Sequence, residues 1–135
     1  MPPKFPSPEW VTSLGEKINS DERYHKIAAK WEADMLVVIE PAGPLKECLY
    51  YYFDLWHGTC RKAVALPGRE GVQPAFTLTA TYDNVVKVIT NQLNPMTAMM
   101  TRKLRVQGPM VVMMRNIPTV LDFVRCCNEN LGEIM

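Results

Sequence analysis

Apolar and polar positions alternate with a period of two over four segments of the chain, which predicts β-strands at residues 33–40, 49–56, 60–66 and 76–81. In the second segment Asp54 marks the polar set, so Phe53 and the residues in phase with it are expected to face the core. Gly58 can adopt a positive φ at little cost and favours a tight hairpin after this segment. A shorter segment, KLRVQG at 103–108, has the outward charges of an edge strand. The sheet should therefore have one apolar face and one wet face.

Apolar residues at helical spacing predict helices around these strands, at residues 8–19, 21–31, 82–93, 95–100, 109–117 and 120–131. Ser20, Thr81 and Asn94 are the expected N-caps, because their side chains can accept a hydrogen bond from the first turn of the following helix. Pro118 should break the last helical stretch, and Thr119 with Asp122 resembles a capping box that starts it again. Strands and helices in this order indicate an α+β domain.

Methionine is concentrated in one part of the chain, since six of the nine lie between residues 94 and 114. They fall on one side of two predicted helices. The first stripe is Met96, Met99 and Met100, and the second is Met110, Met113 and Met114, which Ile117 continues. An unbranched thioether adapts to irregular spaces and to partners of different shape. The stripes therefore predict either ordinary core packing or the wall of a space that accommodates a variable apolar ligand.

The length of 135 residues is sufficient for one domain with its own core, covering residues 1–135. A net charge of +1 argues against nucleic-acid binding through a broad basic face. Prolines stand among the first ten residues where a signal peptide needs an apolar run, and no segment approaches the roughly 18 apolar residues of a membrane span. We therefore expect a cytoplasmic protein in which residues 1–7 form a flexible, proline-rich tail.

Candidate groups for catalysis or metal binding are few. Cys48, His57 and Cys60 are close enough in sequence to suggest a metal or thiol-nucleophile cluster, but packing in a turn and a strand explains the same residues. The adjacent Cys126 and Cys127 could pair with each other only under strain, so free thiols are expected. The sequence thus predicts no catalytic residue, no metal and no cofactor, and a thiol or zinc enzyme is the least favoured hypothesis.

Three basic residues, Arg102, Lys103 and Arg105, stand beside the first methionine stripe. Such a cluster can hold a phosphate or carboxylate head group, or contact an anionic membrane transiently. The same residues also fit an edge strand that is protected by charge. Both interpretations agree with the sequence.

The order of these segments resembles the sterol carrier protein 2 family, and in layout its bacterial and archaeal members. The resemblance rests on a strand followed by TYDNVVKVITNQLNP, the methionine helix, KLRVQGPM and a terminal helix, and it is most specific over residues 76–117. It implies a five-stranded, mainly antiparallel sheet with helices packed on one face and an apolar tunnel between them. Members of the family bind fatty acids, acyl-CoA, sterols, phospholipids or quinone precursors.

From this resemblance we expect a non-catalytic lipid-binding and transfer protein that holds a fatty acyl, acyl-CoA or other isoprenoid- or sterol-like ligand in the tunnel. The alternative is an accessory module that stabilises a partner enzyme of lipid or quinone metabolism and presents its hydrophobic substrate. A head group would meet Arg102, Lys103 and Arg105. The expected lining residues are Phe53, Leu78, Val85, Val86, Ile89, Met96, Met99, Met100, Leu104, Met110, Met113, Met114, Ile117, Leu121 and Val124.

Overall fold

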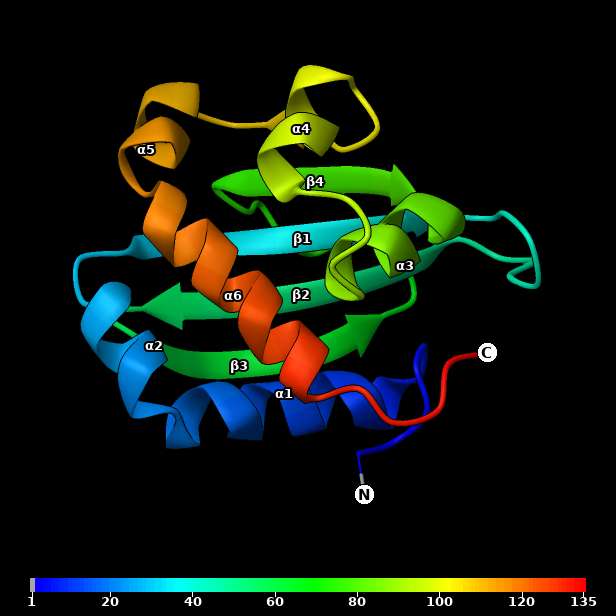
Figure 1. Cartoon of the computed structure of the whole chain (residues 1–135), viewed down its shortest axis with the longest axis horizontal. Helices are drawn as coiled ribbons and strands as arrows, with labels where there is room; N and C mark the ends of the chain where they lie inside the picture. The colour runs from blue at the N-terminus through cyan, green and yellow to red at the C-terminus, as the bar shows by residue number, and fades with distance from the viewer. Residues whose placement is uncertain (1) are drawn as a thin grey trace.

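The computed structural model describes residues 2–135 and contains one five-stranded sheet in the order β3-β2-β1-β4-β5 (Figure 1). The strands are β1 (Glu32–Glu40), β2 (Leu49–Trp56), β3 (Thr59–Leu66), β4 (Phe76–Thr81) and β5 (Arg105–Gln107). The β1–β4 pairing is parallel and the other three pairings are antiparallel. The expected α+β fold with a mainly antiparallel sheet of five strands is confirmed.

Within the described residues, six helices accompany the sheet: α1 (Pro8–Ser20), α2 (Glu22–Ile27), α3 (Tyr82–Ile89), α4 (Pro95–Met100), α5 (Met110–Arg115) and α6 (Ile117–Glu129). Figure 1 shows α6 crossing in front of the sheet, with α1 running along β3 and the two short helices α4 and α5 at the opposite margin, beyond β4. The helices and the apolar face of the sheet enclose the core.

Local capping explains where several helices begin. The side chain of Asn94 accepts a hydrogen bond from Met96 N (2.8 Å), and Thr81 accepts one from Asn84 N (3.4 Å), so both expected N-caps are confirmed. The prediction of Ser20 as the N-cap of α2 was wrong, because Ser20 still belongs to the last turn of α1. Asp21 caps α2 instead, through a 2.8 Å bond from Tyr24 N, since its carboxylate is the first side-chain acceptor outside α1.

The break before the last helix also differs in detail from the prediction. The two helices separate at Asn116, and Pro118 lies in the first turn of α6, where a missing N–H costs no hydrogen bond. Thr119 and Asp122 do not form a capping box. Thr119 lies inside α6 and its hydroxyl donates to Ile27 O (3.3 Å), while Asp122 pairs with arginine side chains.

The expected tight turn joins β2 to β3. His57 has a φ of 52° and Gly58 a φ of 82°, which are the signs that a two-residue hairpin requires. A Cβ at Gly58 would lie 2.7 Å from His25 O, so this position also needs a glycine for close approach to α2. The hairpin prediction is confirmed for both conformation and location.

The N-terminal segment is held against the rest of the molecule. Phe5 is 1% exposed, its N–H donates to Glu133 O (2.9 Å), and its carbonyl accepts from Met135 N (2.9 Å). Its ring packs edge-on against Trp10 at 4.7 Å between centroids. Residues 2–7 are therefore anchored rather than a flexible tail, because an apolar ring gains by burial; Met1 lies outside the described residues.

The two faces of the sheet follow the predicted alternation. On β2 the buried set includes Tyr51, Phe53 and Leu55, whereas Asp54 lies on the outer face and pairs with Arg61 (3.0 Å). The inner set forms the floor of the site described next.

Candidate functional site

An apolar cavity of about 120 Å³ lies between the inner face of the sheet and the helices. Twenty-five of the residues that the structure describes line it, and none of these has a charged side chain. The lining includes alternate positions of β1, β2 and β4, with contributions from every helix. The space therefore offers dispersion contacts and apolar burial. Its polar side-chain groups are the hydroxyls of Tyr24, Tyr51 and Thr119, the two indoles and the Cys127 thiol.

The floor of the cavity is set by strand register. Met35 of β1 lies opposite Phe53 of β2, and Val37 lies between Tyr51 of β2 and Leu78 of β4. All five residues line the cavity. Because side chains alternate between the faces of a sheet, this register places one row of large apolar groups across three neighbouring strands.

The roof is formed mainly by α6. Val120, Phe123, Val124 and Cys127 line the cavity at positions i, i+3, i+4 and i+7, the spacing of one helix face. The Phe123 ring meets the Phe53 ring edge-on, with 5.5 Å between centroids, and so joins the roof to the floor. From α3, Val85 and Ile89 complete this wall with the same helical spacing.

The structure places eight of the fifteen expected residues at the cavity wall: Phe53, Leu78, Val85, Ile89, Met99, Leu104, Met113 and Val124. The other seven lie outside this lining: Val86, Met96, Met100, Met110, Met114, Ile117 and Leu121. The reason is geometric. Helices α4 and α5 have six residues each and lie at the margin of the sheet, so one methionine from each reaches the cavity while the neighbouring methionines face away.

Several residues that line the cavity were not among those predicted from the sequence. The α6 face could have been found from its spacing, because Val120 and Phe123 follow the helical period from Val124. Phe5 has no such local signal, since it reaches the cavity only through the pairing of the two chain ends.

Two buried hydroxyls stand out among the lining residues. Tyr24 and Tyr51 are both buried, and within residues 2–135 neither hydroxyl has a hydrogen-bond partner. Burial raises the pKa of both phenols above the ordinary value, so both stay protonated donors. The two indoles at the wall are satisfied instead, because Trp10 donates to Asn130 O (3.0 Å) and Trp31 to Ala33 O (2.9 Å).

The basic cluster lies beside the cavity, outside its wall. A second, open depression is bordered by Met99, Met100, Arg102, Leu104, Arg105, Val106 and Met110. Met99 and Leu104 border both this depression and the cavity, so two side chains separate the basic surface from the apolar interior. Arg105 forms an ion pair with Glu40, which supports the edge-strand interpretation for this residue. Arg102 and Lys103 are exposed.

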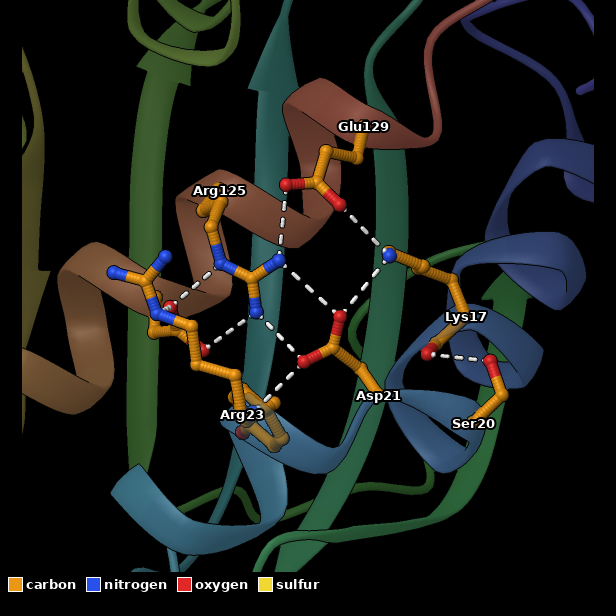
Figure 2. A network of polar contacts seen from close by, with 8 residues as sticks. Lys17, Ser20, Asp21, Arg23, Arg125 and Glu129 are labelled. Atoms are coloured by element: carbon orange, nitrogen blue, oxygen red, sulfur yellow. Dashed lines mark hydrogen bonds and ion pairs between the residues drawn. The ribbon is translucent and has the colours of Figure 1, made fainter.

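An ion-pair network fixes α6 to the first two helices, as Figure 2 shows. The Arg125 guanidinium contacts Asp21 (2.7 Å), Asp122 (2.7 Å) and Glu129 (2.9 Å), and Lys17 bridges Asp21 (3.0 Å) to Glu129 (2.8 Å). The hydrogen bonds from Arg125 hold the pKa of Asp21 well below its usual range. The roof of the cavity is therefore clamped along the C-terminal half of α6.

One side-chain cluster in the described chain has metal-ligand geometry, with donor atoms of Asp21, Asp122 and Cys126 within 4.8 Å of one another. Both carboxylates are engaged by Arg125, and burial raises the pKa of the Cys126 thiol to about 12. A protonated thiol and two neutralised carboxylates favour the ion-pair network over a metal site.

Within residues 2–135, the other candidate cluster from the sequence, Cys48, His57 and Cys60, does not bring its donor atoms close enough together to hold a metal ion. His57 Nε2 lies 2.6 Å from Glu32 Oε2, while the Cys60 thiol is buried and contacts Lys62 O (3.3 Å). Burial raises the pKa of Cys60 to about 11, which disfavours a nucleophilic thiolate.

Comparison with known proteins identifies the family. Residues 12–120 match the SCP-2 sterol transfer family. The chain belongs to this family. It is a family of carriers that are typically non-catalytic, in agreement with the expectation that the chain is not an enzyme. A comparison with curated proteins gave no match.

Solved structures of the family agree with this fold. A crystal structure of sterol carrier protein 2 is 25% identical, with a TM-score of 0.83 over 91% of this chain and 96% of that chain. A possible sterol carrier protein from Thermus thermophilus is 24% identical, with a TM-score of 0.84 over 93% of this chain and 89% of the other. Sterol carrier protein-2 from Aedes aegypti, in complex with the C16 fatty acid palmitate, is 17% identical, with a TM-score of 0.55 over 86% of this chain and 91% of that chain.

Across residues 2–135, no helix combines the length and apolarity that crossing a membrane would need.

Proposed function

We propose that this chain is a lipid carrier that holds an acyl chain, or another elongated apolar ligand, in the cavity between the sheet and α6. The observation that carries the proposal is a cavity wall of twenty-five residues without a charged side chain. Burial of apolar ligand surface in such a wall is favourable and requires little directional chemistry. The palmitate bound by the Aedes aegypti relative supports a fatty acyl ligand class.

The volume of the cavity limits how a long ligand enters. About 120 Å³ is smaller than the roughly 300–1,000 Å³ of most small-molecule sites, so the walls must separate to admit a whole acyl chain. The network around Arg125 restrains α6. We expect α4 and α5 to move instead, because both are short and their cavity residues Met99 and Met113 have adaptable side chains.

The expected affinity follows from apolar burial. A chain of roughly 16 carbons gains about 12 kcal/mol at about 0.8 kcal/mol per CH₂. Association and chain ordering cost at least about 4–6 kcal/mol of this. The remaining 6–8 kcal/mol or so corresponds to dissociation constants from about one to some tens of micromolar, which suits a carrier that must release its cargo.

The polar end of the ligand needs a place outside the charge-free cavity. Arg102 and Lys103 are exposed beside Leu104, which borders the cavity, and can meet a carboxylate or phosphate there. Arg105 contributes less to such a site because it is paired with Glu40. In this proposal the head group lies at the α4–β5 margin and the acyl chain lies inside the cavity.

Two measurements on the isolated protein test the proposal. Native mass spectrometry of freshly purified protein should show a bound lipid, and titration with a fluorescent fatty acid should saturate in the micromolar range. Titrations that stay flat to the solubility limit for acyl, quinone and sterol probes would contradict the carrier function. Obligate co-purification with an enzyme would favour the accessory role, which stays a prediction.

A further inference from the structure

The surface formed by α4, α5 and the segment between them exposes an unusual amount of apolar side chain. We call it the α4–α5 face. Among the described residues, eight large apolar side chains are exposed, and five belong to this face: Met100, Met110, Val111, Val112 and Met114. Met100 is 85% exposed and Val111 62% exposed. Contiguous apolar exposure of this kind indicates a surface that is covered during function.

The charge of the same region is strongly one-sided. Residues 84–121 contain five basic residues and no Asp or Glu, although the chain as a whole carries a net charge of only +1. The remainder of the chain is therefore net acidic. Arg102, Lys103 and Arg115 are exposed on the face, and no ion pair involves them within residues 2–135. Their charge remains available to an anionic partner.

The face is also continuous with the cavity wall. Met99 and Leu104 border the interior cavity on one side and the open depression with Arg102 and Met110 on the other. Figure 1 shows α4 and α5 along the same margin of the molecule, beyond β4, whereas α1 runs along β3 at the opposite edge of the sheet. A ligand that leaves between Met99 and Leu104 would emerge at this face.

We propose that the α4–α5 face docks on the surface of an anionic lipid bilayer. Exposed methionine and valine side chains match the acyl boundary, and unpaired arginine and lysine match the phosphate layer above it. The net acidic remainder of the chain is repelled from the same surface and so orients the molecule. The carrier function explains why the protein would dock, and in that respect this proposal rests on it. The docking itself requires no bound ligand.

The test measures binding of the full chain to vesicles by co-sedimentation. Vesicles of phosphatidylcholine with about 30% phosphatidylserine should bind the protein, whereas pure phosphatidylcholine should bind it far more weakly. Each basic residue near an anionic surface contributes about a fivefold factor in partitioning. The double variant Lys103→Gln with Arg115→Gln should therefore lose at least tenfold in partitioning. The isosteric pair Met100→Gln with Val111→Thr should weaken binding even in low salt, because it removes apolar contact and leaves the charge.

Matched controls carry the same changes elsewhere. Lys46→Gln with Lys62→Gln removes two exposed charges from the β1–β2 loop and from β3, and Met135→Gln removes an exposed apolar group; all should stay within about twofold of the wild type. Equal losses in the controls and the face variants would overturn the proposal, as would wild-type protein that ignores anionic vesicles. Sedimentation showing a lipid-free dimer that Met100→Gln dissociates would assign the face to a second copy of the chain. Vesicle binding that fails while fatty-acid titration succeeds would refute docking and leave the carrier function intact.

Discussion

Filling the cavity from the rigid sheet gives a direct test of whether it is a ligand space. Ala80 of β4 is 4% exposed and lines the cavity. The substitution Ala80→Ile adds three carbon atoms at this wall and keeps a residue type that strands favour. If the wall borders unfilled volume, the added carbons enter it without displacing protein atoms.

The structure sets the scale of the effect. At about 24 cal/mol per Å³, a cavity of about 120 Å³ represents roughly 3 kcal/mol of lost packing, which is the most that complete filling could recover. Three buried carbons are worth up to about 2.4 kcal/mol. We therefore expect the ligand-free Ala80→Ile variant to be between unchanged and about 2 kcal/mol more stable than the wild type. Fatty-acid affinity should fall at least about tenfold, or 1.4 kcal/mol, because the same volume is no longer available to the chain.

Ala33 supplies the matched control. It lies on β1, is 6% exposed and belongs to the core, but it does not line the cavity. Ala33→Ile should overpack and destabilise by about 1–3 kcal/mol. Urea unfolding of both ligand-free variants, with a fluorescent fatty-acid titration, makes the comparison. An equal stability loss in both variants would show that the space near Ala80 is already packed. Full fatty-acid affinity in a stable Ala80→Ile variant would show that the ligand lies elsewhere.

Four further predictions concern the ion-pair network around Arg125, the buried Tyr24 hydroxyl and the four thiols. Arg125→Gln should lower the free energy of unfolding in urea by on the order of 3 kcal/mol, because it leaves the buried Asp122 carboxylate without its main partner. Glu129→Gln, at an exposed position of the same network, should lower it by under about 1 kcal/mol. Equal effects would contradict the assignment of the Arg125 network as the restraint on α6. Because the pKa of Asp21 is lowered in the folded protein, its carboxylate stabilises the fold at any pH above the ordinary carboxyl pKa of about 3.9, and this stabilisation is lost as the pH falls toward the folded-state pKa. The free energy of unfolding should therefore decline below about pH 4. It should decline less in Arg125→Gln, which lacks the hydrogen bonds that lower this pKa. Tyr24→Phe should leave stability unchanged or raise it by about 1 kcal/mol, since it removes a buried hydroxyl without a partner; a clear loss would reveal one. In native protein at pH 8, Cys48 should react first with a thiol reagent and the three buried thiols only after unfolding, which a timed thiol count measures.

The sequence by itself determined the strands, their inward faces and most helix starts. The alternation around Phe53, the Asn94 cap and the hairpin at Gly58 all depend on residues close together in the chain. Backbone sterics, side-chain direction and capping act over a few residues, so the sequence alone predicts the local structure that they produce. The family resemblance over residues 76–117 supplied the strand count and the ligand class.

Only the tertiary structure decided which apolar residues face the cavity and which face solvent. Met99 and Met100 are neighbours on one helix, yet one lines the cavity and the other is 85% exposed, because the place of a six-residue helix at the sheet margin is set by its packing. Phe5 is buried by contact with the other end of the chain, and Arg125 finds Asp21 across 104 positions. Such pairings depend on the global arrangement of the elements, and a local pattern of polarity contains no information about which distant segment will cover it.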